Sequence, residues 1–171
     1  MGSDMRWFTQ WFKRDKKNSK VALEAVHVTL EDVRRAVLQY EKDMPKEIKR
    51  TTLLLGDQSI DLKRLRRYLG GESDQKFYMS HYTYEIFEEK DKHIPIYLDM
   101  VQAAVDDYLD EHDDLPVLTG TRNRQVHYDL LMQRHYLKEK PPISFYLTTE
   151  QFLLTHEEDW HKSQAAIPID L

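Results

Sequence analysis

Residues 95–116, PIYLDMVQAAVDDYLDEHDDLP, contain the clearest structural pattern of this sequence. Apolar side chains recur there at the spacing of a helix face: Leu98, Val101, Val105, Tyr108 and Leu109. The pattern predicts an amphipathic helix that begins after Pro95 and ends before Pro116, because proline is tolerated in the first turn of a helix and disrupts its interior. Seven carboxylates and no lysine or arginine lie between positions 99 and 114, so the end of this helix is strongly acidic.

Three other segments are predicted to be helical. Thr29 opens the first, since an acidic residue three positions later completes an approximate capping box, and Pro45 ends it. Asp61 caps a short second helix, which ends at Gly70. A further helix over residues 123–137 is predicted from four apolar side chains at helical spacing, and two consecutive prolines follow it.

Short strands are predicted between these helices. Alternating side chains indicate a strand over residues 76–88, and shorter strands are predicted at 51–55, 143–147 and 152–155. The last of these is expected to close a hairpin. Separated helices and short hairpin-like strands predict an α+β fold, with about four helices packed on a small, mostly antiparallel sheet. We assign residues 21–156 to this single domain.

The two ends of the chain are assigned outside that domain. Residues 1–4 look like a cloning remnant, which predicts Met5 as the native start. The rest of residues 1–20 forms an aromatic and basic N-terminal segment. Residues 157–171 show no clear periodicity and are predicted to form a loose C-terminal tail.

Three segments of the C-terminal third resemble a small family of uncharacterised proteins from spore-forming Gram-positive bacteria. The segments are VQAAVDDYLDEHDDLPVL, VHYDLLMQRHYLKEKPP and FYLTTEQFLLTH. The resemblance implies a bacterial origin and a domain of unknown function. It carries no assigned activity.

The composition excludes several kinds of chemistry. The chain has no cysteine, five glycines and a net charge of −5. The lack of cysteine excludes disulfides, thiolate metal sites and cysteine nucleophiles, and the net charge argues against non-specific nucleic-acid binding. Neither a nucleophile elbow nor a glycine-rich phosphate loop occurs, so no catalytic residue and no cofactor is predicted. No apolar run reaches the roughly 18 residues of a membrane span, and we expect a cytoplasmic protein.

The eight histidines form no recognisable metal motif. A helical zinc pair places two histidines four positions apart, so that both rings reach one ion. His127 and His135 are eight positions apart, and His156 and His161 are five apart. No metal site is therefore predicted.

One loop is a candidate anion-binding site. Its residues are Gly120, Thr121, Arg122, Asn123 and Arg124. The glycine permits a turn, and the asparagine is expected to cap the following helix, whose free N–H groups would attract an anion. Two arginines at a positive helix end need a negative neighbour. That neighbour is either Asp113 or Asp114 of this chain, or a bound phosphate or partner carboxylate.

The N-terminal segment is the most unusual part of the sequence. On a helical wheel one face carries Trp7, Phe8, Trp11 and Phe12, and basic residues including Lys13 and Arg14 follow at once. Three interpretations stay open: the segment completes the core of its own domain, binds an anionic membrane surface, or docks into a groove of a protein partner.

These observations favour a non-enzymatic interaction or accessory module with an N-terminal docking segment. Its expected partner is a protein or an anionic membrane surface, and lipid binding would place it at the inner face of the membrane. The alternative is a small enzyme or effector-binding protein that uses the anion site at the Gly120 loop.

Overall fold

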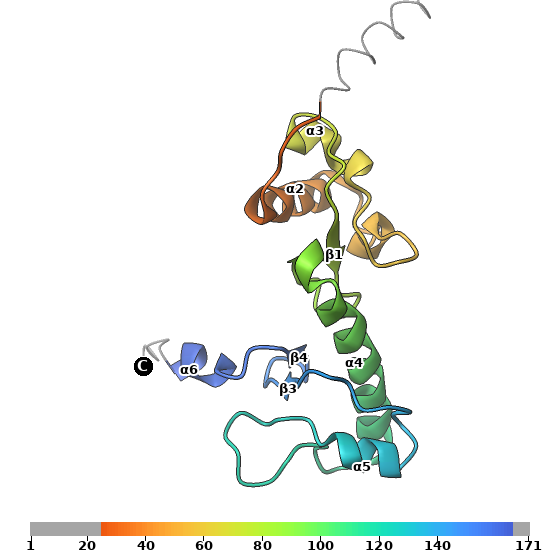
Figure 1. Cartoon of the computed structure of the whole chain (residues 1–171), viewed down its shortest axis with the longest axis vertical. Coiled ribbons are helices and arrows are strands. Elements are labelled where there is room, and N and C mark those ends of the chain that lie inside the picture. Colours follow the sequence, from red (N-terminus) through yellow and green to blue (C-terminus); the bar gives the residue numbers. More distant parts are fainter. Residues whose placement is uncertain (1–24, 166–171) are drawn as a thin grey trace, which may run out of the picture. The chain divides into compact units, whose positions relative to one another are not determined.

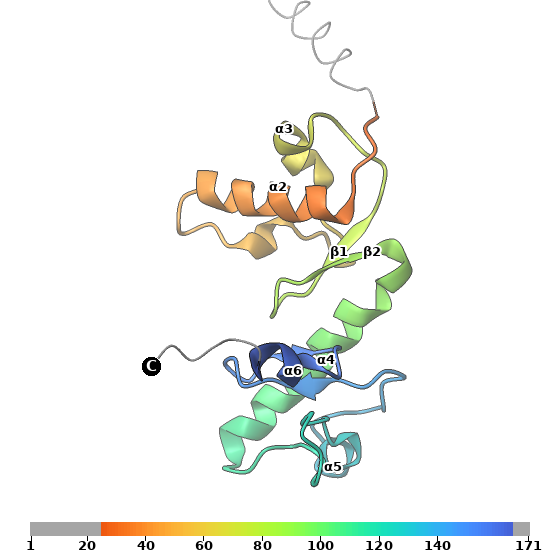
Figure 2. The ribbon, with the colours of Figure 1, turned by 90° about the vertical axis from the view of Figure 1, so that its left-hand side faces the viewer.

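The computed structural model describes residues 25–165, and the side chains of residues 25–162. The chain groups into two compact units, unit 1 up to Phe77 and unit 2 from Tyr78 onward. Figures 1 and 2 show their elements, which combine helices of different lengths with two-stranded sheets.

Unit 1 is built on helix α2, Leu30–Asp43. The predicted capping box is confirmed, since the Thr29 hydroxyl accepts from the Asp32 amide at 3.1 Å and the Asp32 carboxylate accepts from the Thr29 amide at 2.8 Å. The buried face of α2 packs on the 3-10 helix η2, Leu62–Leu65, and on helix α3, Arg66–Leu69. Its buried side chains are Val33, Ala36, Val37 and Tyr40.

The strand predicted at 51–55 is wrong. Residues Arg50–Leu53 form a 3-10 helix, η1, and Leu54 then makes an isolated antiparallel bridge to Ile60. The chain reverses between these two residues, too soon for a longer ladder to form. Leu53 is fully buried, so its burial comes from a helical turn and not from a strand face.

The short helix predicted after Asp61 is confirmed as η2 followed directly by α3. It ends at Gly70, whose φ of 79° lies in the left-handed region that favours glycine. Asp61 makes no side-chain capping bond and instead forms an ion pair with Arg64 at 3.5 Å.

Unit 2 is built on helix α4, His93–Glu111. The predicted helix is confirmed, although it begins two residues before Pro95, which is buried in its first turn. The apolar stripe faces the core of the unit: Leu98, Val101, Val105 and Tyr108 are buried. Within residues 25–165, no helix is long and apolar enough to cross a membrane.

The single strand predicted over 76–88 is wrong, because the chain turns back within it. The structure has two strands, β1 at Phe77–Met79 and β2 at Ile86–Glu88, which form one sheet (Figure 2). Ser80 is fully buried in the turn, and its hydroxyl accepts from the Tyr82 and Thr83 amides. The turn therefore interrupts the alternation that the sequence suggested.

The helix predicted over 123–137 is much shorter, since α5 spans Tyr128–Gln133. Val126 is buried because it pairs with Val117 in an antiparallel bridge, and its amide donates to the Phe145 carbonyl at 2.9 Å. The apolar residues at helical spacing are thus buried for two different reasons: Val126 by the β-bridge, and Leu131 on helix α5. Helix α5 packs against α4 (Figure 1).

The C-terminal hairpin is confirmed. Strands β3, Tyr146–Leu147, and β4, Leu154–Thr155, pair antiparallel. Where a loose tail was predicted, helix α6 spans Trp160–Ala165, and Trp160 is buried. The α+β class is confirmed, with its strands in two two-stranded sheets.

Candidate functional site

The docking residues Trp7, Phe8, Trp11, Phe12, Lys13 and Arg14 lie outside the described residues. The described part of unit 1 begins at Ala25. Ala25 forms a parallel bridge with Glu72, just after α3, and the Val26 amide donates to the Glu72 carbonyl at 2.8 Å. The first described residues accordingly run beside α3 (Figure 1).

Gln75 holds this entry segment in place. Its side-chain carbonyl accepts from the Val28 amide at 2.8 Å, and its side-chain amide donates to the Val28 carbonyl at 3.0 Å. The Ser73 hydroxyl also donates to the Gln75 side chain, at 3.1 Å. Both backbone groups of the buried Val28 are therefore satisfied by one glutamine, a contact for which the sequence offers no local signal.

The outer side of η2 and α3 is basic. Leu62 and Leu65 are buried, which leaves four basic side chains exposed on the outside: Lys63, Arg64, Arg66 and Arg67. Within the described chain, two of them form surface ion pairs, Arg64 with Asp61 at 3.5 Å and Arg66 with Glu72 at 3.4 Å. We call these four residues the basic face. It adjoins Glu72, to which the entry segment is bonded.

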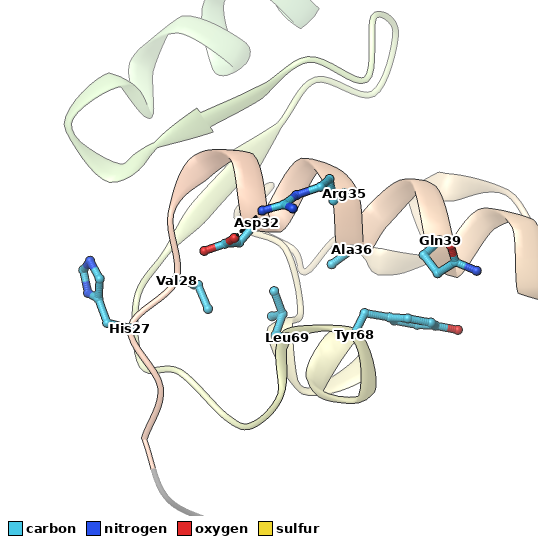
Figure 3. A pocket seen from close by; sticks show the side chains of 8 residues that line it. All are labelled: His27, Val28, Asp32, Arg35, Ala36, Gln39, Tyr68 and Leu69. Carbon is cyan, nitrogen blue, oxygen red and sulfur yellow. Dashed lines mark hydrogen bonds and ion pairs between the residues drawn. The ribbon is translucent and has the colours of Figure 1, made fainter.

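A hollow of about 430 Å³ opens between the entry segment, α2 and α3 (Figure 3). Val28, Ala36 and Leu69 line it with apolar surface, and the Asp32–Arg35 ion pair at 2.8 Å lies on its wall. Its other lining residues are His27, Gln39 and Tyr68.

The electrostatics of this hollow follow from hydrogen bonds. Bonds from Thr29 to the Asp32 carboxylate hold the pKa of Asp32 below its ordinary value. The Tyr68 hydroxyl donates to the Asp43 carboxylate at 2.7 Å, which raises the pKa of Tyr68. The hollow thus combines apolar side chains with polar groups, most of which already have hydrogen-bond partners.

In unit 2, the Gly120 loop differs from its predicted form. Gly120 has a φ of 82°, as expected for a turn, and Thr121 and Arg122 are exposed. Asn123 does not cap a helix, since α5 begins at Tyr128 and its cap is His127, whose Nδ1 accepts from the Leu130 amide at 3.1 Å. The predicted helix N-terminus is therefore not present at this loop to attract an anion.

Asn123 has a different role. Its side-chain carbonyl accepts from the Gln125 amide at 3.3 Å, and its backbone carbonyl accepts from the Trp160 indole N–H at 2.8 Å. Its side-chain amide lies 3.4 Å from a Glu158 carboxylate oxygen. Asn123 therefore joins the loop to α6.

Arg124 is the loop residue with unsatisfied polar groups. It is half-buried with a φ of 55°, and its Nε and Nη2 are buried without a hydrogen-bond partner among the described residues. Asp114, one of the two acidic neighbours considered for the arginines, accepts from the Tyr108 hydroxyl at 2.8 Å. A hollow of about 460 Å³ lies beside the loop and is lined by residues that include Thr119, Thr121 and His127, but by neither arginine.

A group of metal-ligating side chains also lies in unit 2. Ligand atoms of Glu85, His156 and Glu157 all lie within 4.8 Å of one another. Sequence reasoning compared His156 only with the nearby His161 and missed Glu85, which is distant in the sequence. No local spacing could have indicated this group.

The family model for a protein of unknown function, DUF3939, matches residues 23–156. Since the match covers well over half of the chain, the protein belongs to this family. The resemblance to an uncharacterised family is thereby confirmed and extends to unit 1, while the bacterial origin stays a prediction. No curated protein and no solved structure matches the chain.

Proposed function

We propose that the protein is a non-enzymatic interaction module that attaches to an anionic membrane surface through residues 5–17. The observation that supports the proposal is the position of the basic face. The chain enters unit 1 bonded to Glu72, whose carboxylate pairs with Arg66 of the basic face at 3.4 Å. An aromatic and basic segment therefore joins the fold next to further positive charge.

Membrane attachment requires both the aromatic residues and the basic residues. Burying four aromatic side chains by about 100 Å² each contributes roughly 10 kcal/mol at ~25 cal/mol per Å². Ordering about ten backbone residues costs about as much. Each basic residue near an anionic leaflet adds ~1 kcal/mol, so the basic residues after Phe12 and the basic face would turn marginal binding into reversible attachment. The proposal places the protein in the cytoplasm, at the inner face of the membrane.

Co-sedimentation with lipid vesicles tests this proposal. The full chain should sediment with vesicles that contain phosphatidylserine and much less with neutral vesicles, and added salt should weaken the binding. A chain that lacks residues 1–17 should lose binding and keep its melting temperature. A Lys63→Glu/Arg67→Glu variant should bind more weakly than the wild type.

A matched charge reversal in unit 2, Lys90→Glu/Lys138→Glu, controls for net charge, since both lysines are exposed. Equal weakening by the two double variants would show that the basic face has no special part. Unfolding of the truncated chain would assign the aromatic residues to the core. Full-length protein that ignores anionic vesicles, with unchanged stability on truncation, would favour a groove on a protein partner.

A second candidate function rests on Arg124. The Nε and Nη2 atoms form one edge of the guanidinium group, which can hold a carboxylate or phosphate with two bonds. Both atoms are buried without a partner among the described residues. An effector-binding protein would use this edge, and phosphate titration with NMR detection of the amides of Thr121 to Arg124 tests it. Absence of a saturable shift would exclude this candidate.

A further inference from the structure

Two hairpins of unit 2 bring one histidine and two carboxylates together. Glu85 directly precedes β2, and His156 and Glu157 directly follow β4. The His156 Nδ1 lies 3.8 Å from a Glu85 carboxylate oxygen, and a Glu157 oxygen lies within 4.8 Å of both. The three side chains thus converge although no single element carries them.

Packing fixes the orientation of the His156 ring. The ring meets Phe87 of β2 edge to face, with 5.4 Å between the ring centroids and 66° between the planes. Its Nδ1 is buried and has no hydrogen-bond partner among the described residues, and 3.8 Å is too long for a direct bond to Glu85. A buried ring nitrogen without a hydrogen-bond partner destabilises a fold unless a ligand such as a metal ion binds the nitrogen.

The distance between the His156 Nδ1 and the Glu85 carboxylate oxygen suits two ligands of one metal ion. Zinc lies about 2.0–2.1 Å from a histidine nitrogen and about 2.0–2.2 Å from a carboxylate oxygen. Two such ligand atoms are therefore roughly 3.4 Å apart at a tetrahedral angle and at most about 4.3 Å apart. The 3.8 Å between His156 and Glu85 lies inside this range. Glu157 is exposed, so its side chain can rotate to complete the set.

We propose that Glu85, His156 and Glu157 bind a divalent first-row transition metal ion, for which zinc is the probe. One imidazole and two carboxylates are ligands that such ions share, whereas magnesium prefers oxygen ligands alone. A bound cation also removes the repulsion between the two carboxylates. The Thr155 hydroxyl accepts from the Glu157 amide at 3.1 Å and so fixes the backbone turn that presents Glu157.

Three protein ligands leave coordination positions open for water or a small ligand. Glu85 also lines a hollow of about 320 Å³ together with Thr83, Thr155 and Trp160. An ion at this site would therefore adjoin an open hollow of unit 2.

Isothermal titration of zinc into the chelator-treated full chain tests the site. We expect saturable binding of one ion per chain and a rise in melting temperature with zinc. Glu85→Gln and Glu157→Gln, which keep side-chain size, should each weaken binding at least about tenfold, and His156→Ala should abolish it. His93→Ala, at an exposed histidine of α4, is the matched control and should bind as the wild type.

Titration with magnesium at the same concentration should show no saturable binding. Absence of saturable zinc binding overturns the proposal. Zinc binding that survives both glutamine substitutions also overturns it, because the ion would then be held by other residues. Circular dichroism of each variant confirms that lost binding is not lost folding.

Discussion

Asp99 and Gln102 lie three residues apart on α4, and each fastens a different hairpin to the helix. The Asp99 carboxylate accepts from the Ser80 hydroxyl at 2.6 Å and from the His81 amide at 2.9 Å. Gln102 accepts from the Leu154 amide at 2.9 Å. Residues three apart lie on the same side of a helix. Helix α4 therefore holds the two hairpins close together, and with them Glu85 and His156.

Replacing Gln102 with leucine should destabilise unit 2. The Gln102 side chain is buried and also donates to the Phe152 carbonyl at 3.1 Å. Gln102→Leu keeps the approximate size and removes the partner of the Leu154 amide of β4 and of the Phe152 carbonyl in the turn before it, which costs about 1–3 kcal/mol. Urea unfolding measures the loss, and Gln133→Leu at an exposed position of α5 is the control. A loss no larger than the control's contradicts the role given to Gln102.

Asp99→Ala should loosen the first hairpin. Removing a carboxylate that accepts two hydrogen bonds costs about 1.5–3 kcal/mol. Hydrogen exchange at the His81 amide should also accelerate, because that amide loses its acceptor. Asp107→Ala, at an exposed position of the same helix, should change stability by less than about 0.5 kcal/mol. Unchanged exchange at His81 would show that other contacts hold the turn.

The capping box of α2 makes unit 1 sensitive to acid. Thr29→Ala should cost about 1 kcal/mol, and Thr29→Ser should recover most of that loss. Asp32 has a pKa below its ordinary value of 3.8, so its contribution to stability is present above that pH and is lost as the pH falls through its folded pKa. The stability advantage of the wild type over Asp32→Asn should therefore disappear in acid. An advantage that persists at the lowest pH would contradict this linkage.

At the other extreme of pH, Tyr136 should destabilise the fold when it ionises. Its hydroxyl donates to the Glu111 carboxylate, which raises the pKa of Tyr136 to about 12. The folded chain keeps this proton where the unfolded chain, with a pKa of about 10, has lost it. The contribution is therefore complete below pH of about 10 and is lost as the pH rises towards 12. Absorbance titration of tyrosinate, compared between wild type and Tyr136→Phe, measures this pKa, and Glu111→Gln should lower it.

The elements that were predicted correctly from the sequence are those that depend on interactions between residues close together in the chain. The stripe of α4, the capping box at Thr29 and the left-handed Gly70 each depend on residues within a few positions of one another. The errors have distant causes. The strand over 76–88 is interrupted by the turn at Ser80, whose hydroxyl bonds to Asp99 of α4 in addition to its bonds within the turn. The helix over 123–137 is shortened because Val126 pairs with Val117.

The same difference between local and distant contacts applies to the candidate functional sites. Asn123 was assigned as a cap from local spacing, but its partners include Glu158 and Trp160 on the far side of the C-terminal hairpin. Glu85 and His156 meet only because both hairpins are held by α4, so no spacing rule could pair them. The residues of the basic face are close together in the sequence, but the position of this face beside the entry of the chain depends on the bridge between Ala25 and Glu72.

The fluorescence of Trp7 and Trp11 tests the central claim most directly. The chain has three tryptophans, so a folded Trp160→Phe variant leaves these two as the only indole reporters. Anionic vesicles should shift their emission to the blue and brominated acyl chains should quench it, whereas neutral vesicles should do neither. Emission that anionic vesicles leave unchanged at low salt would contradict the account.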